Sequence, residues 1–155
     1  MSGYIMDLRK EIGPRPIIMT GAGVIVVDEV GRILLQHRSD NECWGIPGGS
    51  MELGESFEET ARREVLEETG LVVGDLHLFY LSSGRQNFYE YPNGDQIYLA
   101  GVVYTTTDYC GELRTDRDES LAVAWFHPEE MPARINPLDK PAIESYLELA
   151  KRMNR

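Results

Sequence analysis

Residues 49 to 71 read GSMELGESFEETARREVLEETGL, a glycine-led loop followed by a short, strongly acidic segment. Ser56 and Glu59 have the spacing of a capping box, in which each side chain accepts a hydrogen bond from a backbone N–H at a helix start. Gly70 suits the left-handed conformation that ends many helices. These residues predict a helix over residues 57 to 69.

Three glutamates are expected to crowd one face of this helix: Glu64, Glu67 and Glu68. At roughly 100° per residue, they lie within one arc of about 100°. Most acidic helices are simply solvated, and Glu59 with Arg63 fits a favourable surface pair worth about 0.2–0.5 kcal/mol. Glu64 is different, because the residues three and four positions beyond it are glutamates that repel it. A hard cation such as Mg²⁺ or Mn²⁺ would relieve that repulsion, so spacing alone leaves both a metal site and a solvated surface open.

The same stretch resembles the Nudix box, Gly-x5-Glu-x7-Arg-Glu-U-x-Glu-Glu-x-Gly-U, in which U is aliphatic. Gly49, Glu55 and residues 63 to 71 match this pattern without a departure. The flanking residues 44 to 48 (WGIPG) and 125 to 126 (WF) are also similar to the family. The resemblance implies an α/β (α+β) fold, an α/β/α sandwich with a mixed β-sheet. It also implies metal-dependent hydrolysis of a nucleoside diphosphate linked to a further group.

The resemblance assigns roles to single residues. Glu64, Glu67 and Glu68 match the family's metal-binding carboxylates, and Gly48 matches the glycine whose backbone carbonyl often completes the metal site. The implied cofactor is Mg²⁺ or Mn²⁺. One ion would activate the attacking water, and others would neutralise phosphate charge.

Supporting residues follow from the same match. Arg63 and Glu55 correspond to residues that orient the metal-binding carboxylates, a common role for groups around a metal site. Glu119, in the polar loop before the last predicted strand, resembles an additional metal-binding or base-type glutamate of some members. An exposed loop acid is the alternative reading, and Asp116 and Asp118 of the same loop could take that place. The resemblance leaves Glu68 and Glu119 both open as the general base.

Three further residues are candidates for substrate binding. Arg38 ends a predicted strand where some Nudix enzymes place a basic residue near the substrate phosphates, although a solvated arginine fits equally well. Trp44 leads into the box and is either a base-stacking platform or, more commonly for tryptophan, part of the core. Tyr89 matches a tyrosine associated with dinucleoside polyphosphates, although a tyrosine in a strand is more often simply packed. The place of a proline associated with ADP-ribose holds Gln86 and Asn87.

The remaining elements follow from hydrophobic periodicity and turn residues. We expect helices over residues 4 to 12 and 141 to 153, one helical turn at 128 to 132, and strands at 17 to 28, 32 to 38, 72 to 82, 96 to 106 and 121 to 127. The first two strands should form a hairpin. Residues 1 to 155 are expected to form a single domain, with 1 to 16 as an N-terminal extension that packs or makes a homodimer contact.

Composition narrows the class of protein. The chain has 155 residues, 42% hydrophobic and 26% charged, which is ordinary for a soluble domain. It contains no apolar run long enough to span a membrane, and we expect a cytoplasmic protein with reduced cysteines. Its net charge of −11 argues against long nucleic acid as a partner.

The preferred function is hydrolysis of a small nucleotide: a dinucleoside polyphosphate, nucleoside triphosphate, nucleotide sugar or ADP-ribose. Two alternatives stay open. One is a nucleotide-sensing module without turnover, although such a module has no need of so many mutually repelling acids. The other is removal of pyrophosphate from an RNA 5′ end.

Overall fold

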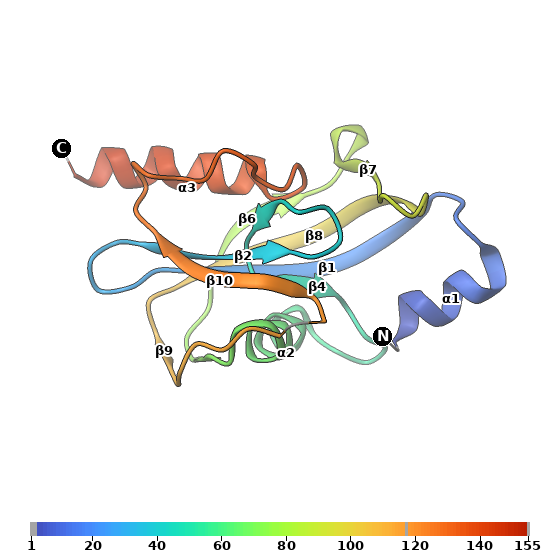
Figure 1. Cartoon of the computed structure of the whole chain (residues 1–155), viewed down its shortest axis with the longest axis horizontal. Coiled ribbons are helices and arrows are strands. Elements are labelled where there is room, and N and C mark those ends of the chain that lie inside the picture. The colour runs from blue at the N-terminus through green and yellow to red at the C-terminus, as the bar shows by residue number, and fades with distance from the viewer. Residues whose placement is uncertain (1–2, 117, 155) are drawn as a thin grey trace.

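The computed structural model describes residues 3–116 and 118–154. The first two residues of the expected N-terminal extension, and residue 117 of the polar loop, lie outside this description. Helix α2 (Phe57–Thr69) covers one side of the β-sheets and α3 (Lys140–Met153) the other, while α1 (Tyr4–Ile12) lies at one end (Figure 1). The expected arrangement, a mixed sheet between helices, is confirmed.

The larger sheet has the strand order β4-β1-β8-β6, and β7 also pairs with β8. Its strands are β1 (Ile17–Val26), β4 (Gly48–Ser50), β6 (His77–Ser82), β7 (Phe88–Glu90) and β8 (Gln96–Thr106). Strands β1 and β8 run parallel, whereas the other pairs are antiparallel, so the sheet is mixed.

The smaller elements complete the architecture. A second, antiparallel sheet has the order β10-β2-β3, formed by β10 (Ser120–Phe126), β2 (Ile33–Arg38) and β3 (Trp44–Gly45). The short strands β5 (Val72–Val73) and β9 (Tyr109–Cys110) pair with each other, and η1 (Arg85–Asn87) is a single 3₁₀ turn.

The core has two parts, one on each side of β1. Val24 and Val26 pack with Ala61 and Val65 of α2, whereas Ile25 belongs to the cluster that includes Ile143 of α3. Successive side chains of a strand point to opposite faces. Strand β1 therefore contributes side chains to both parts of the core. The apolar stripe of α2 packs against one face of the sheet.

The predicted bounds of α2 are correct because local chemistry sets them. Ser56 and Glu59 form the expected capping box, and Gly70 ends the helix with a φ of 81°. Within residues 3–116 and 118–154, no helix is both long and apolar enough to cross a membrane.

Two expectations about other elements were wrong, and a third, the hairpin, was confirmed only at its turn. The strand expected over residues 72 to 82 is two strands, because the Asp108 carboxylate accepts a hydrogen bond from the N–H of Asp75 (2.9 Å) and bends the chain between them. The helical turn expected at residues 128 to 132 is a plain turn closed by the N–H of Glu130 and the carbonyl of His127. The expected hairpin opens after one bridge, and β1 and β2 then enter different sheets.

Candidate active site

Three glutamates from two distant parts of the chain gather at one point. Glu64 and Glu68 are one turn apart on α2, and Glu119 comes from the loop before β10; each offers a carboxylate oxygen within 4.8 Å of the others. Glu64 is 8% exposed and Glu68 only 3%. The Ser39 N–H donates to the Glu119 carbonyl (3.1 Å) and fixes this loop against the end of β2.

Burial and mutual repulsion disfavour the charged forms of this cluster. Burial raises the pKa of Glu68 well above its ordinary value, and the nearby Glu64 carboxylate raises it further. The pKa of Glu64 is also raised, first by burial, although Arg63 opposes the change. Burial and the charge of Glu64 raise the pKa of Glu119. A cation among these groups would offset both effects.

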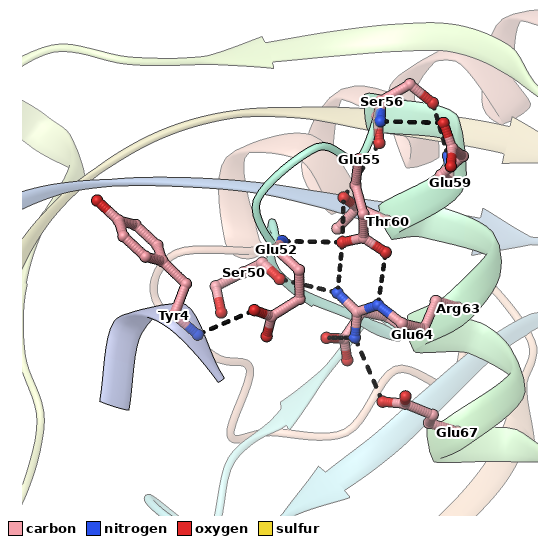
Figure 2. Close-up of polar contacts among 10 residues, drawn as sticks. All are labelled: Tyr4, Ser50, Glu52, Glu55, Ser56, Glu59, Thr60, Arg63, Glu64 and Glu67. Atoms are coloured by element: carbon pink, nitrogen blue, oxygen red, sulfur yellow. Dashed lines mark hydrogen bonds and ion pairs between the residues drawn. The ribbon is translucent and has the colours of Figure 1, made fainter. Parts of the chain in front are cut away.

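Arg63 links the loop of residues 49 to 56, here called the box loop, to the carboxylates of α2 (Figure 2). Its guanidinium donates to both oxygens of Glu55, at 2.7 and 2.9 Å, and to Glu64 Oε1 at 2.8 Å. A further bond reaches the carbonyl of Ser50 at 3.0 Å. The paired Arg63 lowers the pKa of Glu55 to about 2. The orienting roles expected for Arg63 and Glu55 stay predictions.

Two residues that the sequence did not single out hold Glu68. Gln36, in β2, is 1% exposed, and its amide donates to Glu68 Oε2. Ser120 donates to the other end of the same amide, at Gln36 Oε1. Gly48 donates its N–H to Glu68 Oε1 at 2.8 Å. No local pattern marks Gln36, because its role depends on β2 lying beside α2.

The other residues that match the family pattern lie in different positions relative to the cluster of Glu64, Glu68 and Glu119. Glu67 lies at its rim: its side chain is half exposed and pairs with Arg63 at 3.4 Å. At Gly49 a Cβ atom would lie 2.6 Å from the Glu64 carboxyl carbon, so only glycine leaves that carboxylate where it is. The expected contribution of the Gly48 carbonyl to a metal site stays a prediction.

The carboxylates lie in the wall of a cavity of about 510 Å³. Arg38 and Tyr89 also line it; Arg38 is paired with Asp40 (2.6 Å), and the Tyr89 hydroxyl accepts a hydrogen bond from Asn41 (2.9 Å). Trp44 is not among the described residues that line this cavity. It stacks on the His37 ring, with centroids 4.8 Å apart, and meets Phe126 edge-on, as the packing alternative predicted.

Comparisons with known proteins show the family to which this fold belongs. The family model of the NUDIX domain matches residues 18–146. A Bacillus subtilis protein named "Putative 8-oxo-dGTP diphosphatase" is 33% identical over 135 residues, which cover 86% of this chain and 83% of that protein. The "MutT-like protein" of Streptomyces ambofaciens is 33% identical over 132 residues, covering 84% of this chain and 77% of that one. The crystal structure of a MutT NUDIX hydrolase from Burkholderia pseudomallei aligns with a TM-score of 0.71 at 28% identity, covering 83% of this chain and 97% of that chain. This chain therefore belongs to the Nudix hydrolase family.

Proposed function

We propose that this protein hydrolyses a pyrophosphate linkage in a small nucleotide, a nucleoside diphosphate derivative, using Mg²⁺ or Mn²⁺. The observation that carries the proposal is the gathering of Glu64, Glu68 and Glu119 in the wall of a cavity. Carboxylate oxygens are the ligands that these hard cations prefer. Burial raises the pKa of all three acids, and the charge of Glu64 raises those of Glu68 and Glu119 further, so a divalent cation fits among them well.

Some residues of the site would bind the metal, and others hold the metal-binding carboxylates in position. Glu64, Glu68 and Glu119 would hold the metal, with Glu67 and the Gly48 carbonyl as further ligands implied by the family pattern. When bound, the metal supplies activation of water and neutralisation of phosphate charge. Arg63 and Gln36 keep the buried carboxylates in place before any substrate arrives, which reduces the reorganisation that the reaction requires.

The reaction balances without another reactant. A water oxygen forms a bond to phosphorus, the bond from that phosphorus to the bridging oxygen breaks, and the two phosphate products separate. Glu68 or Glu119 accepts the water proton. Both oxygens of Glu68 already accept hydrogen bonds from the chain, whereas Glu119 reaches the cavity wall from a loop.

Glu68→Gln and Glu119→Gln separate these roles. Each variant removes a carboxylate that would hold the metal, so each should weaken Mn²⁺ binding. At saturating Mn²⁺, the variant that also loses the base should keep a kcat about 10²–10⁴-fold lower than the wild type. An electron paramagnetic resonance titration with Mn²⁺ measures that affinity without turnover.

The test of the function is a hydrolysis panel. It contains canonical and 8-oxo nucleoside triphosphates, dinucleoside polyphosphates, ADP-ribose, nucleotide sugars and triphosphorylated RNA, each with Mg²⁺, Mn²⁺ or chelator. The oxidised nucleotide is included because a relative's name refers to it, and the dinucleoside polyphosphates because Tyr89 lines the cavity. Glu58→Gln, an exposed acid on the same helix, is the matched control for Glu68→Gln.

Metal-dependent cleavage that is lost in Glu68→Gln and kept in Glu58→Gln supports the proposal. Binding of a nucleotide without cleavage of any would overturn it in favour of a sensing module. Preference for RNA, with affinity that falls steeply as salt rises, would favour the RNA-end activity instead.

A further inference from the structure

Helix α1 lies outside residues 18–146, the segment that the family model matches. Even so, three of its side chains line the cavity that holds the carboxylates: Ile5, Met6 and Arg9. A segment beyond the shared family domain therefore supplies part of this cavity.

Hydrogen bonds at both ends fix α1 in this position. Arg9 is 8% exposed, and its guanidinium donates to three backbone carbonyls. These belong to Gly13 (2.9 Å), Arg15 (2.6 Å) and Gln96 (2.6 Å). At the other end, the Tyr4 N–H donates to Glu52 Oε2 of the box loop at 2.9 Å (Figure 2). A helix of 9 residues is marginal alone, so these contacts determine where it lies.

The cavity extends from the carboxylates along β1 and β8 towards the start of both strands. Met19 and Leu99 are partners in the parallel ladder and both line the cavity. Further along β1, Ala22 pairs with Gly49, where an added Cβ atom would lie 2.6 Å from the Glu64 carboxyl carbon. Three strand residues span about 10 Å. A nucleoside monophosphate bridges such a distance between its phosphate and its base.

Four side chains at the end of the cavity near the start of β1 and β8, here called its arm, are apolar and adaptable, and the charged residues Arg9 and Asp95 at the same end pair with each other at 3.8 Å. Ile5 and Met6 of α1 line it together with Met19 and Leu99. Methionine fills irregular gaps and makes favourable contacts with aromatic rings. A flat, uncharged ring suits this lining, whereas a second phosphate does not.

We infer that α1 is a specificity element, in which Ile5 and Met6 close this arm of the cavity and hold the base of the substrate nucleotide. The inference rests on the proposed function, because it takes the carboxylates as the phosphate end of the site. It assigns substrate selection to a helix outside the residues that the family model matches.

The test is the substitution Met6→Trp, in which the larger side chain should fill the arm of the cavity. Met6 is 40% exposed, so the larger ring has room to be accommodated without unfolding the protein. The KM of each nucleotide that the wild type cleaves should rise about 10-fold or more, since even one methylene in such a pocket is worth about 10–200-fold. The kcat value should change by less than about 3-fold, because the carboxylates are untouched. Lys10→Trp, on the exposed face of α1, is the matched control and should change neither value.

Inorganic pyrophosphate with Mg²⁺ serves as a second probe, because it occupies only the carboxylate end. Its inhibition constant should be the same in the wild type and in Met6→Trp. Met6→Ala, which empties the arm, should also raise KM, and it keeps the test valid if the tryptophan variant does not fold.

The outcomes separate the two proposals. If the wild type cleaves no nucleotide of the panel, the proposed function fails and the inference fails with it. If the wild type cleaves nucleotides and both Met6 variants keep its KM, only the inference is overturned. A pyrophosphate inhibition constant that rises as much as KM would also overturn it, since α1 would then act on the carboxylate end.

Discussion

Removing the charge of Glu55 should make the protein less stable near neutral pH and have a clearly smaller effect in acid. The Arg63 guanidinium binds both Glu55 oxygens, and the N–H of Glu52 donates to one of them at 2.8 Å. Together they lower the pKa of Glu55 from 4.5 to about 2. In Glu55→Gln the amide keeps the shape of the side chain and part of the hydrogen bonding, but it carries no charge.

The magnitude follows from that pKa difference. At about 1.36 kcal/mol per pKa unit, the change from 4.5 to about 2 corresponds to about 3.4 kcal/mol. The Arg63 side chain is 26% exposed, so water screens the pair, and we expect a loss of about 1–3 kcal/mol in the free energy of unfolding. Because the pKa is lowered in the folded state, this stabilisation is complete above a pH of about 4.5 and disappears as the pH falls towards about 2.

Urea unfolding followed by tryptophan fluorescence, in chelator, measures the effect at about pH 7 and about pH 3. Glu129→Gln, an exposed acid in a turn, is the control and should change stability by less than about 0.5 kcal/mol. A loss in Glu55→Gln that is equally large at both pH values would refute the reasoning. So would a loss at neutral pH no larger than that of the control.

Three further predictions concern the carboxylates and their helix. Gln36→Leu removes the amide that donates to Glu68, so Mn²⁺ affinity and activity should each fall about 10–100-fold; unchanged affinity in a Mn²⁺ titration would contradict this. Gly49→Ala places a methyl group against the Glu64 carboxylate, so the same titration should show weakened binding, while urea unfolding shows a change below about 1 kcal/mol, since a flexible side-chain end moves rather than the backbone. Ser56→Ala removes the helix cap and should cost about 1 kcal/mol of stability with activity unchanged; a large loss of activity would show that the cap also shapes the site.

The parts of the site that were predictable are those encoded by short-range chemistry. The cap at Ser56 and the left-handed Gly70 set the bounds of α2, and helical spacing then placed Glu64 and Glu68 together. Glu119 was proposed from its resemblance to a family position, and the structure places it beside them. In each case the prediction required only the residue's neighbours in sequence or its match to the family pattern.

The residues that were missed depend on contacts between distant segments. Gln36 reaches Glu68 only because β2 packs beside α2. The bend after Val73 depends on Asp108, a residue more than thirty positions away that binds the N–H of Asp75. Periodicity within one strand contains no information about either contact. The lining of the cavity by α1 has the same origin.

The direction of α2 has a consequence for the protein as a whole. Peptide dipoles leave partial negative charge at a helix C-terminus, and the last turn of α2 adds acidic side chains and contains no basic residue. Arg114, from the loop that also carries Glu119, donates to the carbonyl of Leu66, and its N–H donates to that of Thr69. The C-terminal end of α2 and the acidic loop thus both carry negative charge, and the two segments are in contact. A divalent cation at the carboxylates offsets that charge for both, so metal binding should stiffen the last turn of α2 and that loop as a single unit.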